Sequence, residues 1–171
     1  LMIARPNSPT GNAFPIDRMK KICSEFRGII LIDEAYADFS RENCLDFVNE
    51  FDNVIVTRTF SKSYSLAGIR LGFAMSSRFN ISQMYKVKDS YNVNFLTQEL
   101  GIAALRDQED FKKIVKRICR TRSFLIEDLE DLSFRVIPSD ANFVFVSPPG
   151  RNGGEYFENL KQKNILVRYF P

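Results

Sequence analysis

Residues 28–39 read GIILIDEAYADF, in which an apolar run ends abruptly at two acidic residues. The aliphatic stretch 29–32 is typical of a parallel strand that is buried on both faces. A second apolar run follows at 54–56 (VIV), and residues 43–51 between the two runs can form a short helix. Strand, helix and strand at this spacing predict βαβ units and therefore a parallel sheet.

The pattern continues on both sides of these strands. Residues 1–4 resemble the end of a strand, and residues 16–27 carry apolar side chains at helical spacing. Residues 5–12 between them are rich in proline and glycine, which predicts a loop. Residues 68–75 (GIRLGFAM) are a further predicted strand. The expected fold class is α/β, with a mostly parallel sheet and helices on both of its faces.

The carboxyl-terminal half of the chain is mainly helical. Its predicted elements are helices at about 80–90 and 96–107, a long helix at 109–132, and a helix near 153–163 between strands at 142–146 and 165–168, with a loop at 147–154. The long helix would extend about 33 Å at ~1.5 Å per residue, which is enough to bridge two domains.

The long helix suggests how the domains divide. We expect residues 1–119 to form part of a large domain and residues 120–171 to form a smaller, incomplete α/β domain. The chain opens like a strand already under way and closes on the apolar run 165–171. These ends favour a fragment of a larger polypeptide. Such a piece would expose an unpaired sheet edge and would be inactive by itself.

Composition excludes several classes of function. Of 171 residues, 44% are hydrophobic and 26% are charged, as in ordinary globular proteins. The 24 basic and 21 acidic residues are too evenly balanced to indicate nucleic-acid binding. No apolar run reaches the roughly 18 residues of a membrane-spanning helix. The sequence lacks histidine, the commonest metal ligand, and we predict no metal site. Cys23, Cys44 and Cys119 favour reduced thiols in a cytoplasmic protein.

Polar residues follow each of the predicted strands. Asn7 follows the first strand, Asp33 and Tyr36 follow the second, and Lys62 follows the third. In parallel α/β sheets, ligands bind beyond the carboxyl ends of the strands. Sheet geometry therefore lets these four side chains converge on one crevice.

Their chemistry suits an organic cofactor that has an aldehyde, a ring nitrogen and a phosphate. A lysine amine can form a Schiff base, and a nearby carboxylate favours a protonated ring nitrogen. Hydroxyls and an arginine can hold a phosphate, and Thr59, Ser61 and Arg70 lie on either side of Lys62. A lysine paired with a carboxylate in this way is the mark of enzymes that use pyridoxal 5'-phosphate (PLP).

Three ordered motifs also resemble a known family. PNSPTG (6–11), DEAYADF (33–39) and TFSKSYSLAGIRLGF (59–73) are similar to successive motifs of the fold-type I PLP-dependent aminotransferases. The sequences of these motifs are most similar to those of the histidinol-phosphate aminotransferases. Residues 91–107 and 164–170 resemble the same group, so that the resemblance covers nearly the whole chain.

The resemblance implies a role for each cofactor residue. Lys62 would be the Schiff-base lysine and would carry protons between substrate and cofactor. Asp33 would pair with the pyridine nitrogen, and Tyr36 would hydrogen-bond the ring 3' oxygen. Thr59, Ser61 and Arg70 would hold the phosphate. The family usually has asparagine at the position of Ser8, so Asn7 would have to take over that contact with the 3' oxygen.

Two further residues are candidates for substrate contacts. Arg168 resembles the arginine that meets the substrate phosphate in this family, and Asn142 is either substrate-facing or structural. The implied reaction transfers an amino group between histidinol phosphate and 2-oxoglutarate, in histidine biosynthesis, by a homodimer.

Two alternatives remain open. One is a related fold-type I enzyme such as a threonine-phosphate decarboxylase. The other is a non-catalytic module, either the PLP-binding domain of a transcriptional regulator or a degenerate fragment that only packs.

Overall fold

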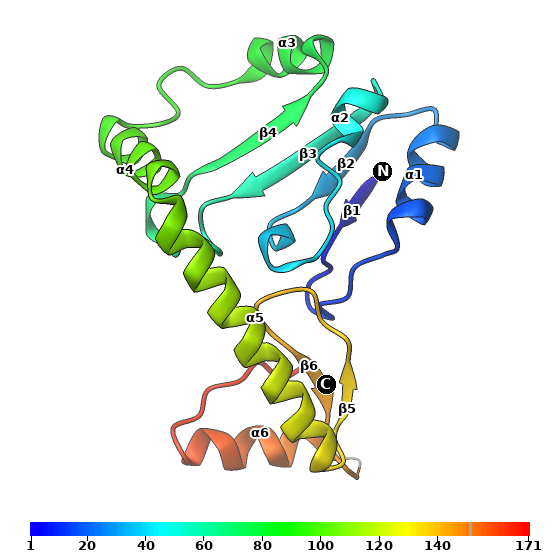
Figure 1. Cartoon of the computed structure of the whole chain (residues 1–171), viewed down its shortest axis with the longest axis vertical. Helices are drawn as coiled ribbons and strands as arrows, with labels where there is room; N and C mark the ends of the chain where they lie inside the picture. The colour runs from blue at the N-terminus through cyan, green and yellow to red at the C-terminus, as the bar shows by residue number, and fades with distance from the viewer. Residues whose placement is uncertain (151) are drawn as a thin grey trace.

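The computed structural model describes residues 1–150 and 152–171, so position 151 of the predicted loop 147–154 lies outside the described residues. The first sheet has the order β1 (Met2–Ala4), β2 (Ile30–Asp33), β3 (Val54–Thr59) and β4 (Gly72–Ser76). β1, β2 and β3 run parallel, whereas β4 is antiparallel to β3 (Figure 1). The predicted α/β class with a mostly parallel sheet is confirmed.

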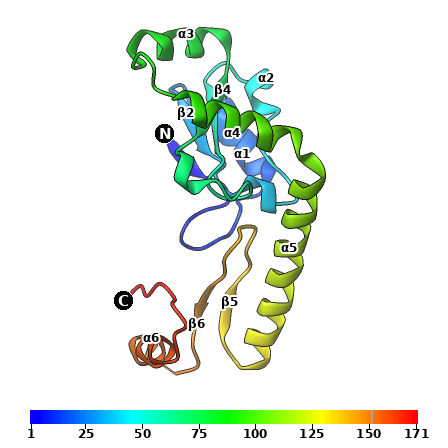
Figure 2. The same ribbon diagram turned by 90° about the vertical axis from the view of Figure 1, so that its left-hand side faces the viewer.

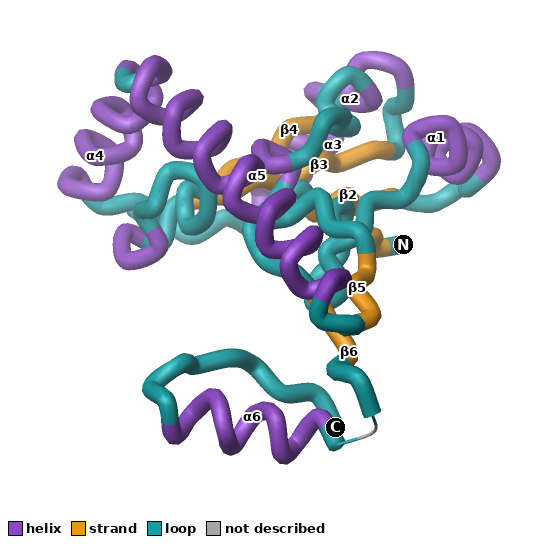
Figure 3. The backbone as a smooth tube through the Cα atoms, turned by 60° about the horizontal axis from the view of Figure 1, so that its bottom comes forward, coloured by secondary structure: helices purple, strands orange, loops and turns teal. Residues whose placement is uncertain are grey.

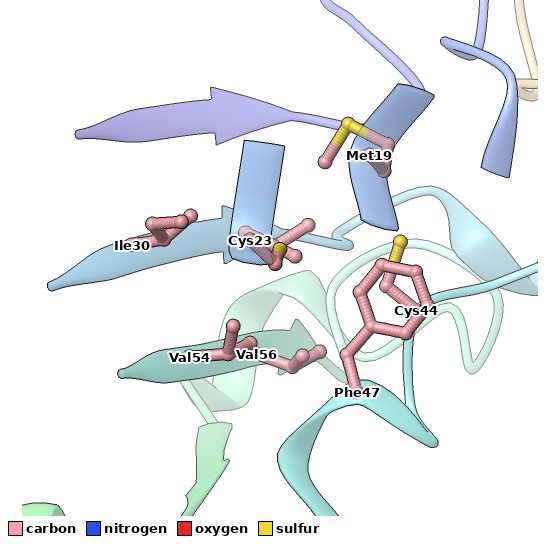
Figure 4. Packing of buried hydrophobic residues seen from close by; sticks show 8 residues of the cluster. Met19, Cys23, Ile30, Cys44, Phe47, Val54 and Val56 are labelled. Carbon is pink, nitrogen blue, oxygen red and sulfur yellow. The ribbon is translucent and has the colours of Figure 1, made fainter. Parts of the chain in front are cut away.

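Two helices cover one face of this sheet. α1 (Ile16–Glu25) connects β1 to β2, and α2 (Phe47–Glu50) lies between β2 and β3 in the chain. Every second residue of β2 and β3 points toward these helices, because successive side chains of a strand point to opposite faces. The buried cluster between helices and sheet consists of Met19, Cys23, Ile30, Ile32, Cys44, Phe47, Val54 and Val56 (Figure 4).

The opposite face is more open than the sequence predicts. Leu31 is only partly buried, and Ile29, just before β2, is 48% exposed. The prediction of a stretch buried on both faces is therefore wrong for these two residues. Met2, the register partner of Leu31 on β1, is 77% exposed. The reason is that α1 and α2 pack only against the face that carries Ile30 and Ile32.

The sheet continues into three helices. The 3-10 turn η2 (Ala67–Ile69) precedes β4, so that the strand predicted at 68–75 lies at Gly72–Ser76 instead. α3 (Arg78–Val87), α4 (Phe95–Arg106) and α5 (Gln108–Asp131) confirm the next three predicted helices, with ends shifted by three residues or fewer. No helix of the described residues has the length and apolar character needed to cross a membrane.

A second sheet lies at the other end of α5 (Figure 2). It pairs β5 (Arg135–Ile137) with β6 (Phe145–Ser147) in antiparallel fashion, and α6 (Gly153–Gln162) follows. The strand predicted at 142–146 thus begins three residues later, and β5 has no counterpart among the predicted strands. The predicted domain boundary near residue 119 falls inside the continuous helix α5 and stays a prediction.

The strand predicted at 165–168 is wrong, because residues 165–171 have no regular secondary structure. Instead of pairing with a strand, this tail runs back beside α6 (Figure 3). Tyr169 stacks on Phe157 with ring centroids 5.8 Å apart, and the ring of Phe170 lies 5.7 Å from that of Phe145. The apolar pattern correctly indicates packing, but a strand also needs a partner for its backbone groups.

The loop after β1 touches the loop before β6. The backbone nitrogen of Asp140 donates to the carbonyl of Gly11 at 2.8 Å. Gly11 has a φ of +81°, and a Cβ built on it would lie 2.5 Å from Ser139 Oγ. Only glycine combines this left-handed backbone with so close an approach.

Arg122 of α5 joins the same two regions. Its guanidinium donates to the carbonyl of Phe39 at 3.2 Å and to that of Ala141 at 2.7 Å. Phe39 ends the 3-10 turn η1 (Ala37–Phe39) beyond β2, and Ala141 lies in the loop before β6. One side chain therefore ties the first sheet to the second.

Asn94 offers a test of local stability. Its side chain caps α4 by accepting a hydrogen bond from the Thr97 backbone nitrogen at 2.9 Å. We expect Asn94→Ala to destabilise the first turn of α4 by about 1 kcal/mol, and amide exchange at Thr97 to quicken about fivefold. Asn92→Ala is the matched control, because the Asn92 side chain accepts a bond from the exposed Lys88 and caps no helix among the described residues. Equal exchange rates in the two variants would contradict the cap.

Candidate active site

The carboxyl end of β2 presents Asp33 at the edge of the sheet. Asp33 is paired in register with Thr57 of β3, and Oδ1 accepts a hydrogen bond from the Ala35 backbone nitrogen at 3.0 Å. The buried Ile32 precedes it, so Asp33 lies on the face away from α1 and α2. Within the described residues, the other carboxylate oxygen accepts no hydrogen bond and is free to meet a ligand.

Lys62 and Tyr36 come together as predicted. Lys62 Nζ lies 5.1 Å from the centroid of the Tyr36 ring, a cation–π contact between two partly buried side chains. The ring of Phe143 packs against that of Tyr36 in an edge-to-face arrangement, with ring centroids 5.1 Å apart. The loop before β6 therefore covers Tyr36, and the predicted Asn142 is an exposed residue of that loop.

Thr59 and Ser61 form a small hydroxyl cluster where β3 ends. Their side-chain oxygens are 3.0 Å apart, and the Ser61 backbone nitrogen donates to Thr59 Oγ1 at 3.1 Å. Thr59 Oγ1 also donates to the carbonyl of Leu71 at 3.3 Å. The two hydroxyls thus lie together next to the segment that carries Lys62.

The side chain of Arg70 folds back onto the preceding 3-10 turn η2. It is exposed, has a φ of +55°, and donates through Nη1 to the carbonyl of Ala67 at 2.8 Å. Contact with a ligand held at Thr59 and Ser61 would require its side chain to leave that carbonyl.

Two other predicted residues have their contacts within their own segments. The side-chain amide nitrogen of Asn7 donates to Thr10 Oγ1 at 2.6 Å, within the loop after β1. Arg168 lies in the carboxyl-terminal tail, where its guanidinium is 5.0 Å from the centroid of the Phe170 ring. Neither residue is hydrogen-bonded to Asp33 or Tyr36 within the described part of the chain.

A network of charged and hydroxyl groups that no sequence pattern singled out connects the segments of Tyr36 and Lys62. Arg58 donates to Glu34 Oε2 through Nε at 3.0 Å and through Nη2 at 2.8 Å. Its Nη1 lies 3.4 Å from Asp38 Oδ1, and Ser63 Oγ donates to Asp38 Oδ2. The available signal was one charged residue directly after β2 (Glu34) and another of opposite sign within the neighbouring β3 (Arg58), an arrangement that favours a buried pair.

Burial keeps the nearby thiol of Cys44 out of the chemistry. Desolvation, followed by the negative charge of Glu34, raises the pKa of Cys44 to about 12. The Cys44 backbone nitrogen donates to Glu34 Oε1, which holds the two residues together. At neutral pH this thiol is protonated and is not a nucleophile.

Comparison with known proteins defines the family to which this chain belongs. The sequence profile of the family described as aminotransferase class I and II matches residues 1–170, and the chain belongs to this family.

Within this family, the chain is similar to histidinol-phosphate aminotransferases. A histidinol-phosphate aminotransferase from Synechocystis sp. is 48% identical over 170 residues, which make up 99% of this chain and 49% of the relative. The chain thus spans about half the length of the curated relatives that it matches.

Solved structures agree with this fold. The histidinol-phosphate aminotransferase from Sinorhizobium meliloti, in complex with pyridoxal-5'-phosphate, has a TM-score of 0.87 at 26% identity. The comparison covers 98% of this chain and 48% of that one. L-threonine-O-3-phosphate decarboxylase from Porphyromonas gingivalis shares the fold, with a TM-score of 0.84 at 20% identity, over 98% of this chain and 53% of the other.

Proposed function

We propose that the protein carrying these residues is a PLP-dependent aminotransferase that moves an amino group between histidinol phosphate and 2-oxoglutarate. The observation that carries the proposal is the lysine amine over the Tyr36 ring, in a chain of the aminotransferase family. The Synechocystis sp. relative, at 48% identity, supports the choice of substrate.

The donor set fits PLP group by group. Lys62 supplies an amine for the aldehyde, and Asp33 supplies a carboxylate for the ring nitrogen. Thr59 and Ser61 supply paired hydroxyls for the phosphate, and Arg70 can join them after a side-chain rotation. When bound, PLP supplies a protonated pyridine ring that withdraws electrons from the substrate Cα.

The chain's own residues would then do four things. The Lys62 amine takes the proton from the substrate Cα onto Nζ and then gives it to C4' of the cofactor. The negative charge of Asp33 keeps the ring nitrogen protonated. Tyr36 orients the ring through its hydroxyl. Phe143, packed on Tyr36, excludes water from that side.

The remaining proposed contacts involve the outer residues. Asn7 would donate to the ring 3' oxygen through the second N–H of its side-chain amide, since Thr10 Oγ1 accepts only one of the two. Arg168 would meet the substrate phosphate, and Asn142 would line the entrance beside Phe143.

We also propose a cytoplasmic homodimer. Three free thiols support a reducing compartment. Large apolar side chains on and before α4 are exposed, among them Tyr91 at 98% and Leu96 at 71%, which supports a covered surface in the assembled protein.

The test of the proposed function is chemical labelling. The intact protein, with whatever sequence flanks residues 1–171, is incubated with PLP, reduced with borohydride and digested. We expect the phosphopyridoxyl group on the peptide that holds Lys62. Lys86 is the internal control, because it lies exposed on α3, where it donates to Gln83 Oε1 at 2.6 Å.

Two results would speak against the proposal. Label spread evenly over Lys62 and Lys86 would exclude Lys62 as the attachment point. Release of carbon dioxide from a phosphorylated amino acid, without glutamate formation from 2-oxoglutarate, would favour a decarboxylase instead.

A further inference from the structure

Glu34, Arg58, Asp38 and Ser63, here called the Arg58 network, connect the segment of Tyr36 with the segment of Lys62. We infer that this network holds Lys62 over Tyr36 in the geometry from which the lysine joins PLP. Arg58, Asp38 and Ser63 are thus positioning residues that do not touch the cofactor. The inference rests on the proposed function.

The inner half of the network spans two strands. The Glu34 backbone nitrogen donates to the Thr57 carbonyl at 2.9 Å, so that Glu34 continues the β2–β3 pairing by one residue and lies beside Arg58. Asp33 and Thr57 point to the open face, whereas Glu34 and Arg58 point to the face of α2 and η1. The Arg58–Glu34 ion pair therefore lies on the face of the sheet opposite to that of Asp33.

The outer half connects the two segments that form the site. Asp38 lies in η1, two residues after Tyr36, and Ser63 is the residue after Lys62. The Ser63 hydroxyl donates to Asp38 Oδ2, and Arg58 reaches Oδ1 of the same carboxylate. Each partner of the Lys62–Tyr36 contact is thus held through a near neighbour in the chain.

Burial makes these bonds specific. Glu34 and Ser63 are each 2% exposed, and no buried side-chain nitrogen or oxygen of the described residues lacks a hydrogen-bond partner. A buried hydroxyl without its acceptor, or a buried carboxylate without its cation, is strongly unfavourable. The segment around Lys62 consequently has one low-energy position relative to Tyr36.

Arginine is required at position 58 because of its shape. Three of its N–H groups address two carboxylates that lie on different segments, through Nε, Nη1 and Nη2. Lysine has the same charge but no planar fork, and it cannot make this set of bonds.

The experiment separates positioning from general stability. Joining PLP to Lys62 forms a bond between the lysine nitrogen and the aldehyde carbon and releases one water. The rate of this step is measured by timed borohydride quenching of the intact protein. Affinity before the step is measured with 4'-deoxypyridoxine 5'-phosphate, which keeps ring and phosphate but lacks the aldehyde.

Ser63→Ala removes one bond of the network and leaves the Arg58–Glu34 pair intact. We expect attachment to Lys62 to slow about tenfold, with affinity for the deoxy compound kept within about twofold. Ser76→Ala is the matched control. The Ser76 hydroxyl donates to the Val54 carbonyl at 2.5 Å, at the far end of β3, so its loss should leave attachment unchanged.

Asp38→Asn provides a second route if Ser63→Ala does not fold. It keeps the volume of the side chain and removes the charge that both Arg58 and Ser63 address. The same slowing, again with unchanged affinity for the deoxy compound, would support the inference.

The inference is overturned if Ser63→Ala attaches PLP as fast as Ser76→Ala. It is also overturned if attachment and affinity for the deoxy compound fall together, because a network that only stabilises the fold would weaken both. Failure of the parent protein to label Lys62 is a different result, which rejects the proposed function itself.

Discussion

Lys62→Ala in the intact protein reduces glutamate-forming turnover by roughly ten-thousand-fold, the largest effect that we expect from any single substitution. The amine has two tasks, since it is the covalent attachment point and the base at the substrate Cα. Loss of a positioned acid–base group alone accounts for about a hundredfold to ten-thousand-fold. The measurement is glutamate formation from 2-oxoglutarate with histidinol phosphate as donor.

The control for this substitution is Lys86→Ala, which removes an exposed lysine of α3 and should leave turnover unchanged. Lys62→Ala should still retain some PLP through Thr59 and Ser61, since these hydroxyls do not depend on the amine. Turnover within tenfold of the parent would remove Lys62 from the reaction.

Asp33→Asn has the second-largest expected effect, a loss of about a hundredfold in turnover. The substitution keeps size and shape, and an asparagine oxygen can still accept the bond from the Ala35 backbone nitrogen. What is lost is the negative charge that keeps the ring nitrogen protonated, so electron withdrawal from the substrate weakens while PLP still binds.

Asp46→Asn serves as the control for Asp33→Asn. Asp46 is exposed at the start of α2 and makes no side-chain capping bond there. Asp33→Asn turnover within threefold of the parent would show that Asp33 is not the partner of the ring.

Local sequence patterns were sufficient for the first sheet because each of its strands has its own signal. The apolar runs 29–32 and 54–56 predict β2 and β3, and the long amphipathic stretch predicts α5 within one residue at each end. The second sheet was less predictable. β5 is only three residues long, too short for a period of two to be recognised, and β6 was predicted to begin three residues too early. The tail 165–171 has the composition of a strand without a partner strand.

The site shows the same division between local and long-range information. Asp33, Tyr36 and Lys62 were predictable because each follows a strand whose carboxyl end lies at the same edge of the sheet. The contact of Phe143 with Tyr36 was not, since it joins residues more than a hundred positions apart. Ser63 likewise looked like one hydroxyl among several, until its bond to Asp38 distinguished it.

Helix α5 has a mechanical consequence. Its 24 residues make a stiff rod about 36 Å long, in which none of the residues is fully buried. Arg122 pins this rod to the Phe39 and Ala141 carbonyls, close to the loop that carries Phe143. Phe111, near the start of the same helix, stacks on Tyr64 with ring centroids 4.3 Å apart, so α5 is fixed at two points along its length. A stiff helix held in this way acts as a spacer between the segment of Lys62 and the loop that carries Phe143.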